Sequence, residues 1–270
     1  MLLARLFPKK STFFEKNKKF YVKLGAKMDS FGWIQLFTIW TLVVSGIVIN
    51  KGTIDRYVYW DWIGWEIGIL KLVFASALFI FLLKPKKLWY VGEKELNKTG
   101  FIIHSIVAFV LLMIGWINLE VSFRDFPILF PYCIAFLSGS LVFQFTLDLD
   151  QEKGVWNHYN WENKMGVFGG SVILMIVALL FGIHLDDPIL SSAAAVSLPF
   201  PLIVLIWPNH VRHLQRARIF PIFTFAMALC IRAPWFFFPL GLMFFVIRTI
   251  NYFRFGIVYP SFAVDFLEEE

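Results

Sequence analysis

The chain has 270 residues, of which 59% are hydrophobic and 16% charged, and its formal net charge is +6. Soluble domains average about 45–50% apolar and about 25% charged residues, so the composition excludes an ordinary soluble protein. Cys133 and Cys230 both lie in apolar runs, which excludes a disulfide framework and a zinc site built on cysteines. The sequence has no P-loop, which argues against a nucleotide-driven pump.

The first thirty residues are basic and carry no pattern typical of a cleaved signal peptide. From Lys9 to Lys27, lysines alternate with aromatic residues in "KKSTFFEKNKKFYVKLGAK". This pattern predicts an amphipathic helix on the cytoplasmic leaflet. We therefore expect a membrane-surface segment over residues 1–30 and a single transmembrane helical domain over 31–270.

Long apolar runs follow, and crossing a bilayer takes about 20 residues. Hydropathy predicts six spans: Phe31–Ile49, Gly64–Leu83, Phe101–Leu119, Asp125–Leu147, Val167–Leu185 and Ile189–Trp207. The sixth contains Pro199 and Pro201, which predict a kink.

The last apolar run, Ile219–Ile247, is too long for one comfortable span. As a single helix it would place Arg232 at the bilayer centre, which costs roughly 2.5–3.5 kcal/mol. A helical hairpin turning at Arg232-Ala-Pro avoids that cost. The sequence therefore predicts an all-α bundle of about eight transmembrane helices.

The basic residues predict the orientation. With the N-terminus in the cytoplasm, all but five of the 25 Lys and Arg fall on cytoplasmic segments, the exceptions being Lys51, Arg56, Lys71, Arg124 and Arg232. The positive-inside rule then places both termini in the cytoplasm, as in a multi-pass protein of a bacterial inner membrane. Basic flanks that contact anionic lipid explain the pI near 9.3, so no nucleic-acid partner is expected.

An unusually polar segment, "DLDQEKGVWNHYNWENK", runs from Asp148 to Lys164 after the fourth span. If the helix of that span continues, Asp148 and Glu152 lie one turn apart, and a frayed end would bring Asp150 beside them. Carboxylates grouped in this way suit Mg²⁺ held together with substrate phosphates. The alternative is a solvated helix end whose acids balance local lysines.

The next cytoplasmic loop, "WPNHVRHLQRAR", collects two imidazoles and three guanidiniums. A helix would align His210 with His213 and His213 with Arg216, because each pair is three residues apart. Guanidinium groups match phosphate geometry, so this loop is a candidate diphosphate site. Positive-inside anchoring is the alternative for its arginines.

The acidic segment resembles the second Asp-rich motif of the UbiA-type intramembrane prenyltransferases, Asp-x-x-x-Asp followed by Gly-Val-x-Thr and an apolar helix. Here "DLDQEKGVWN" precedes the span that begins at Val167, with Glu152 in the second acidic place and Asn157 in place of threonine. The resemblance implies a helical bundle that binds a prenyl diphosphate through Mg²⁺. It implies metal ligands at Asp148 and Glu152, with Asp150 as a third candidate beside them, and we expect substrate contacts at Asn157 and His158 of the same segment. The guanidinium and imidazole groups of the basic loop predict the other substrate contacts, at His210, Arg212, His213 and Arg216.

The family's first motif, Asn-Asp-x-x-Asp-x-x-x-Asp, has no match in the loop "KPKKLWYVGEKELNK". A divergent relative that binds an isoprenoid lipid is therefore favoured over an active prenyltransferase. The alternatives are a non-enzymatic subunit that binds a membrane-protein partner, and a transporter. Lys71, deep in the second span, needs a partner or an aqueous path. His104 and His184 lie at opposite ends of their spans, so they cannot ligate one haem together. A haem between His104 and His210 or His213 stays an alternative, and a structural role is the simpler interpretation of a lone intramembrane histidine.

Overall fold

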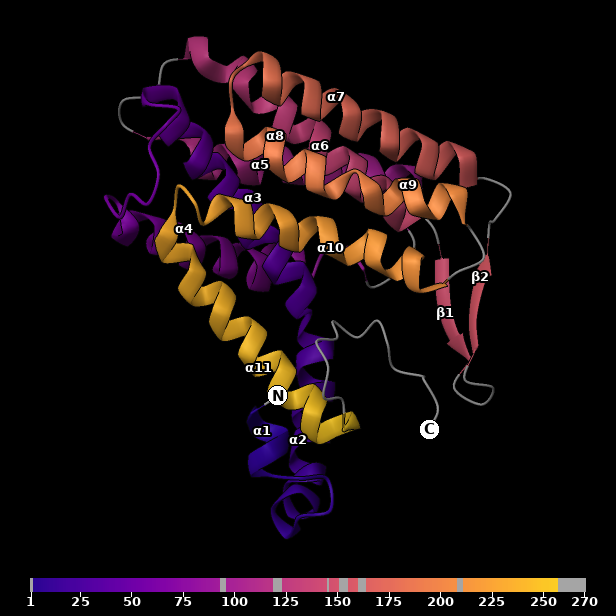
Figure 1. The fold of residues 1–270 in the computed structure, drawn as a ribbon. Coiled ribbons are helices and arrows are strands. Elements are labelled where there is room, and N and C mark those ends of the chain that lie inside the picture. Colours follow the sequence, from indigo (N-terminus) through magenta and orange to yellow (C-terminus); the bar gives the residue numbers. More distant parts are fainter. Residues whose placement is uncertain are drawn as a thin grey trace. The chain divides into compact units, whose positions relative to one another are not determined.

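The computed structural model describes residues 2–92, 96–118, 123–144, 146–150, 155–159, 164–207 and 211–256, with the backbone alone at 123–125, 146–150, 155–159, 211–212 and 214–215. The chain divides into two compact units (Figure 1). The terminal unit combines Met1–Trp33 with Phe238–Glu270, and the bundle unit is Ile34–Phe237.

The bundle unit is built from long apolar helices. Its first half contains α3 (Trp33–Ile54), α4 (Trp65–Leu78) continued by the π-helical turn η1 (Phe79–Leu83), α5 (Lys98–Trp116), and α6 (Leu129–Leu141) between the 3₁₀ turns η2 (Phe123–Ile128) and η3 (Val142–Gln144). Its second half contains the π-helical turn η5 (Met165–Gly169), α7 (Gly170–His184), α8 (Pro188–Ser197), α9 (Pro199–Ile206), α10 (Val211–Leu229) and the 3₁₀ turn η6 (Pro234–Phe236).

Within the described residues, seven helices are long and apolar enough to cross a membrane. They confirm the six predicted spans and add Pro234–Phe255 as the seventh. The helix α10 lies in the remaining apolar run, but it begins among arginines and does not reach the same apolarity. The chain turns between Leu229 and Pro234, so the predicted turn at Arg232-Ala-Pro is confirmed, and the total of eight spans stays a prediction.

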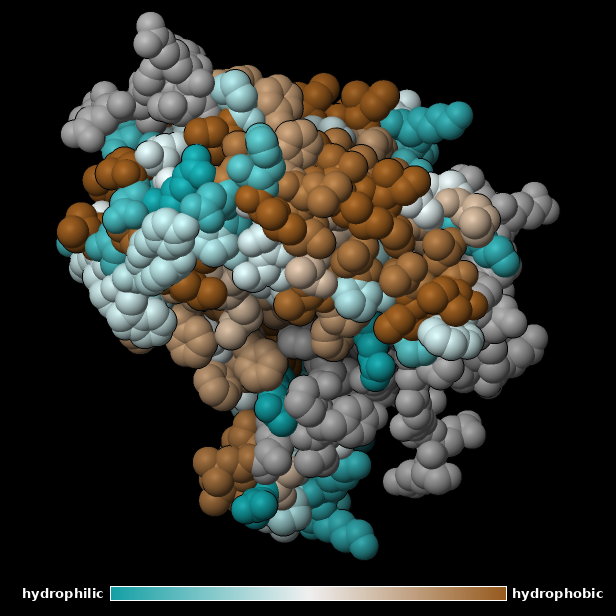
Figure 2. Space-filling model, turned by 45° about the horizontal axis from the view of Figure 1, so that its top comes forward, coloured by the Kyte–Doolittle hydropathy of each residue, from teal (hydrophilic) through white to brown (hydrophobic). Residues whose placement is uncertain are grey.

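Side-chain burial is distributed as expected for a protein surrounded by lipid. Many large apolar side chains are exposed, among them Ile173, Leu180 and Ile183 of α7. Figure 2 shows broad hydrophobic areas on one face of the molecule. By contrast, 72% of the apolar stretch of α3 is buried, against 28–44% for the other six candidates, so α3 is the central helix of the bundle unit. Helices with apolar exteriors satisfy their backbone polar groups internally, which is what a bilayer requires.

Close helix packing in the bundle unit depends on small residues. A Cβ atom on Gly46 of α3 would overlap the carbonyl oxygen of Leu112, and one on Gly115 of α5 would overlap that of Val43. These two glycines therefore allow the backbones of α3 and α5 to approach each other directly, a common arrangement between membrane helices.

The kink predicted in the sixth span is confirmed as a break between α8 and α9. The first of these helices ends at Ser197 and the second begins at Pro199, which lacks the amide hydrogen needed to continue the ladder. At its other end, α8 begins with Pro188 at the first helical position and Asp187 as N-cap.

The predicted helix across the acidic segment is wrong. Thr146–Asp150 forms strand β1, which pairs antiparallel with β2 (Val155–Tyr159) (Figure 1). The alternation of "TLDLD" has the two-residue period of a strand, and "VWNHY" is rich in β-branched and aromatic residues. The all-α class is confirmed for the described residues, because their assigned secondary structure is helical apart from this ribbon.

The terminal unit contains α1 (Leu2–Leu6), α2 (Thr12–Phe31) and α11 (Phe237–Phe255). The hydroxyl of Ser11 caps α2 by accepting a hydrogen bond from the Phe14 amide. Aromatic packing joins this helix to α11, with Phe14 buried against Tyr252 and Phe253 and the ring of Tyr21 stacked 4.4 Å from that of Phe253. The amphipathic helix predicted over Lys9–Lys27 thus forms, and its position on the membrane surface and the boundary at residue 30 stay predictions.

Candidate functional site

An apolar cavity of about 80 Å³ lies inside the bundle unit between α3, α5, α6 and α10. Its lining residues are mostly aliphatic or aromatic: Thr38, Thr41, Leu42, Ser45, Val91, Leu112, Tyr132, Ala135, Phe136, Gly139, Ser140, Phe143, Pro221, Ile222 and Phe225. The hydroxyls of Thr38, Thr41 and Ser45 donate to carbonyls of their own helix, at 2.7–2.9 Å. The cavity therefore presents few polar groups to an occupant and suits a short stretch of hydrocarbon.

Small residues of α6 leave this space open. A Cβ atom built on Gly139 meets no neighbouring atom within 4 Å, and Ala135 presents only a methyl group. Larger side chains at these positions would extend into the cavity.

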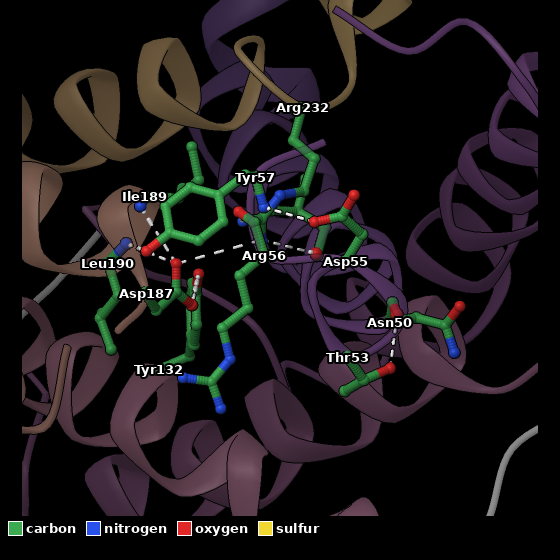
Figure 3. A network of polar contacts seen from close by, with 11 residues as sticks. Asn50, Thr53, Asp55, Arg56, Tyr57, Tyr132, Asp187, Ile189, Leu190 and Arg232 are labelled. Atoms are coloured by element: carbon green, nitrogen blue, oxygen red, sulfur yellow. Dashed lines mark hydrogen bonds and ion pairs between the residues drawn. The ribbon is translucent and has the colours of Figure 1, made fainter. Parts of the chain in front are cut away.

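A second, polar cavity of about 230 Å³ lies in the same unit. Its walls come from the end of α3 and the loop after it, the start of α6, the corner between α7 and α8, and the turn after α10: Ile49, Gly52, Thr53, Arg56, Ile128, Tyr132, Leu185, Asp187, Leu190 and Arg232. Arg56, Tyr132, Asp187 and Arg232 approach one another in Figure 3.

Arg232 is the most buried charged group of this cavity, with 1% of its surface exposed. It donates from Nη1 to the carbonyl oxygen of Val48 at 3.2 Å and from Nη2 to that of Arg56 at 2.5 Å. Its guanidinium occupies space left by Gly52, where a Cβ atom would overlap Nη1. Carbonyl acceptors near the C-terminal end of a helix favour a cation, which offsets part of the cost of burying this arginine.

Asp187 connects three elements of the polar cavity (Figure 3). Its Oδ1 accepts hydrogen bonds from the amides of Ile189 and Leu190, at 3.0 and 3.3 Å, and thereby caps α8. Its Oδ2 accepts the hydroxyl of Tyr132 at 2.8 Å, and Nη1 of Arg232 lies 4.0 Å from Oδ1. Both carboxylate oxygens are therefore engaged by the protein itself.

The two cavities follow one another along the bundle, and Tyr132 lines both. On α3 the apolar cavity is lined from Thr38 to Ser45 and the polar one from Ile49 to Thr53. At 1.5 Å per residue, the lined stretch of α3 from Thr38 to Thr53 spans about 22 Å. The apolar cavity and the charged cavity therefore lie next to each other along α3.

The rim of the polar cavity is tied by a side-chain contact between two loops. The hydroxyl of Tyr57 donates to Oδ2 of Asp186 at 2.5 Å, and this bond raises the pKa of Tyr57 above its ordinary value. It connects the loop after α3 to the corner before α8.

The structure describes only part of the site predicted from sequence. The ribbon register places Asp148 opposite Asn157 and Leu147 opposite His158, and Asp148 and Asp150 occupy alternate positions of β1. Asp148 lies in the extended strand β1, so the continued helix that would put it one turn from Glu152 is absent at Asp148. The side chains of Asp148, Asp150, Asn157, His158 and Arg212, and the whole of Glu152 and His210, lie outside the described part of the chain.

The helical alignment predicted for the basic loop is confirmed where it is described. His213 and Arg216 both lie on the first turns of α10, and both are half-buried. Farther along, the guanidinium carbon of Arg218 stands 4.9 Å from the ring centroid of Phe143, which lines the apolar cavity. Within the described residues, Nε of Arg218 is buried without a hydrogen-bond partner.

His104 and Lys71, whose roles the sequence alone does not decide, both have hydrogen-bond partners in the structure. His104 is fully buried, accepts the Tyr90 amide at Nε2 (2.9 Å), and contacts the Gly100 carbonyl through Nδ1 (2.7 Å), which confirms its structural role. The ammonium of Lys71 donates to the carbonyl oxygens of Gly115 and Ile117, at 2.6 and 2.7 Å, where α5 ends.

The polar cavity is the feature that sequence reasoning missed. In the sequence, Arg232 indicates only that a turn avoids placing a charge in mid-membrane. Tyr132 is one aromatic residue in a long apolar run. The available signal was the coincidence of Arg232 with "DDP" at Asp186–Pro188, both at span ends predicted on the same side of the membrane.

Apolar helices of membrane-spanning length, apolar exteriors and a charged pocket at the helix ends define a multi-pass integral membrane protein. Comparison of the chain with protein-family models, with curated proteins and with solved structures finds no match.

Proposed function

We propose that the protein binds an isoprenoid lipid, with part of the hydrocarbon chain in the apolar cavity. The observation that carries the proposal is this cavity, which lies between apolar helices and whose α3 hydroxyls are bonded to their own helix. Its volume of about 80 Å³ accommodates a short stretch of the chain, and the rest would lie along the exposed apolar helices.

The anionic head of this lipid would lie toward the ribbon and the start of α10. Phe143 lines the cavity and precedes Asp148 by five residues, and the Arg218 guanidinium lies over its ring. The resemblance to UbiA-type enzymes supports Asp148 and Glu152 as ligands of Mg²⁺, which would neutralise a diphosphate, and Asp150 would lie beside them. Diphosphate contacts would come from Asn157 and His158 and from the imidazole and guanidinium groups of His210, Arg212, His213 and Arg216. These residues supply the oxygen ligands and cationic donors that such a head needs.

Binding is favoured over prenyl transfer, because the sequence lacks the first acidic motif of the family. A transport function is less favoured than the sequence suggested. Lys71 was the deepest charge without a partner, and its bonds to two carbonyls remove the need for an aqueous path.

The proposal includes a topology. If α10 also crosses the membrane, the crossings total eight and both termini lie in the cytoplasm. The ribbon and the start of α10 then lie on the same side, and the polar cavity faces the opposite side. The distribution of Lys and Arg supports this orientation, which corresponds to a bacterial inner membrane.

Binding of geranylgeranyl diphosphate to the purified protein, measured by calorimetry with Mg²⁺ and with a chelator, tests the proposal. We expect Mg²⁺-dependent binding that weakens at least about tenfold in Asp148→Ala/Glu152→Ala, because each charged hydrogen bond or ligand contributes about 1.5–3 kcal/mol. Gly139→Leu should weaken binding with or without Mg²⁺, since its side chain would fill the apolar cavity.

Gly169→Leu is the matched control, because a Cβ atom there also meets no atom within 4 Å and the residue does not line the cavity. The proposal is wrong if the wild-type protein shows no Mg²⁺-dependent binding. It is also wrong if Asp148→Ala/Glu152→Ala and Gly139→Leu both bind as the wild type does.

A further inference from the structure

The polar cavity is lined by charged groups whose structural contacts do not account for the space between them. Its lining includes two arginines, Arg56 and Arg232, and one carboxylate, Asp187. The bonds of Arg232 to the Val48 and Arg56 carbonyls explain how that residue fixes the turn after α10 against α3. They do not explain a space of about 230 Å³ beside it, which is large enough for several water molecules or a small anionic group.

The donors left over point to a negatively charged occupant. Nε of Arg232 is buried and has no hydrogen-bond partner in the part of the chain that the structure describes. Arg56 is exposed and lines the cavity, and its guanidinium forms no hydrogen bond within the described residues. A guanidinium provides several N–H donors in a planar fork that matches carboxylate and phosphate oxygens.

A cation fits the same space poorly. Asp187 is the one carboxylate among the lining residues, and its oxygens already accept two amides and the Tyr132 hydroxyl. The other acidic groups nearby are also engaged: Asp55 accepts the Tyr57 amide, and Asp186 accepts the Tyr57 hydroxyl. The lining residues therefore carry a surplus of one positive charge and leave donors unused on the two arginines.

We propose that the polar cavity is an oxyanion site that binds a phosphate or carboxylate group through Arg56 and Nε of Arg232. Two sources supply this chemistry: the head of an anionic lipid whose chain continues past Tyr132, or a free anion from solution. The site is separate from the ribbon and the start of α10, so a free anion can bind there independently of the isoprenoid. A lipid chain that passes Tyr132 would instead occupy the apolar cavity proposed for the isoprenoid.

The experiment measures ligand-induced shifts of the thermal midpoint of the purified full-length protein in phosphatidylcholine nanodiscs. One arm titrates inorganic phosphate and acetate, and the other incorporates phosphatidic acid. We expect stabilisation of the wild type in at least one arm. Arg56→Gln should weaken the interaction at least about tenfold, the loss expected for one charged hydrogen-bonding group.

Arg56 is exposed, so its substitution should leave the fold intact, which the midpoint without ligand verifies. Arg232→Lys is the second variant: it keeps the buried charge and removes the Nε donor, and it should weaken binding as well. Lys86→Gln is the matched control, because Lys86 is an exposed basic residue away from the cavity.

Stabilisation by phosphate or acetate identifies a free anion as ligand, and stabilisation by phosphatidic acid alone identifies a lipid head. The inference is overturned if no probe stabilises the wild type, or if Arg56→Gln responds to the probes as the wild type does. In that case the cavity is a water-filled space beside a structural arginine.

Discussion

Gly52 and Arg232 form a close contact that depends on the absence of a side chain. The Arg232 guanidinium lies against the backbone of α3 where a Cβ atom on Gly52 would overlap Nη1. Because the guanidinium is held there by two carbonyls and is almost fully buried, it cannot move aside without losing those bonds.

We therefore expect Gly52→Ala to destabilise the protein by about 1–3 kcal/mol, the usual cost of overpacking a well-packed interior. Thermal or denaturant-induced unfolding in detergent measures the change. Gly169→Ala serves as control, since a Cβ atom there meets no atom within 4 Å, and it should be neutral or slightly stabilising. Equal stability of the two variants would contradict the described position of Arg232.

The ion pair between Lys51 and Asp61 makes stability depend on pH. Burial raises the pKa of Asp61, but the hydrogen bonds from Lys51 (2.8 Å) and from the Ile63 amide (2.9 Å) outweigh it and leave the pKa below its ordinary value. A depressed pKa means that this contribution is present above the unfolded pKa of about 3.9 and is lost as the pH falls through the folded value.

Asp61→Asn should therefore lower the thermal midpoint near neutral pH and lose part of the wild type's decline below about pH 4. Since both side chains are partly exposed, at 16% and 22%, we expect an effect of at most about 1 kcal/mol. Glu15→Gln, at an exposed carboxylate of α2, controls for the loss of one negative charge. A decline with pH that is identical in wild type and Asp61→Asn would exclude this role.

At the scale of elements, the sequence predicted those features that depend on one segment alone, such as spans, breaks and turns. An apolar run of about 20 residues is sufficient to predict a span, and Pro199 is sufficient to predict a break in the sixth. Arg232 predicted the turn after α10 because a charge in mid-membrane is costly.

The ribbon and the polar cavity were not predictable in the same way. The segment "TLDLD" alternates with the period of a strand, but it directly follows an apolar span, so its sequence fits the end of that helix equally well. The cavity forms where four distant parts of the chain converge, at Gly52, Tyr132, Asp187 and Arg232. No local sequence pattern predicts which distant residues will be in contact. Whether the acidic and basic residues of the predicted site converge stays a prediction.

At the scale of the whole molecule, the orientation in the membrane can be tested through exposed positions. We introduce single cysteines at Lys10, Tyr59 and Lys86, all exposed, in a chain whose Cys133 and Cys230 are replaced by serine. A membrane-impermeant thiol reagent added to intact cells should label Tyr59→Cys and should leave Lys10→Cys and Lys86→Cys unlabelled until the membrane is permeabilised.

This pattern follows from the positive-inside rule, which places the loop between α3 and α4 outside and the basic segments inside. Labelling of all three positions after permeabilisation controls for reactivity. Labelling of Lys10→Cys in intact cells would reverse the orientation, and with it the side of the membrane on which each proposed site lies.

The bonds from Arg232 to Val48 and Arg56 join residues 184 and 176 positions apart in the chain. During synthesis the N-terminal segments emerge first. The contacts of α3, the most buried helix, with Arg232 can therefore form only after the chain has been synthesised past α10. Contacts of such long sequence separation slow folding, because the chain loses entropy before it gains them. Maturation of the protein is therefore expected to finish with the arrival of the turn after α10, and chains that end before it should be degraded as incomplete.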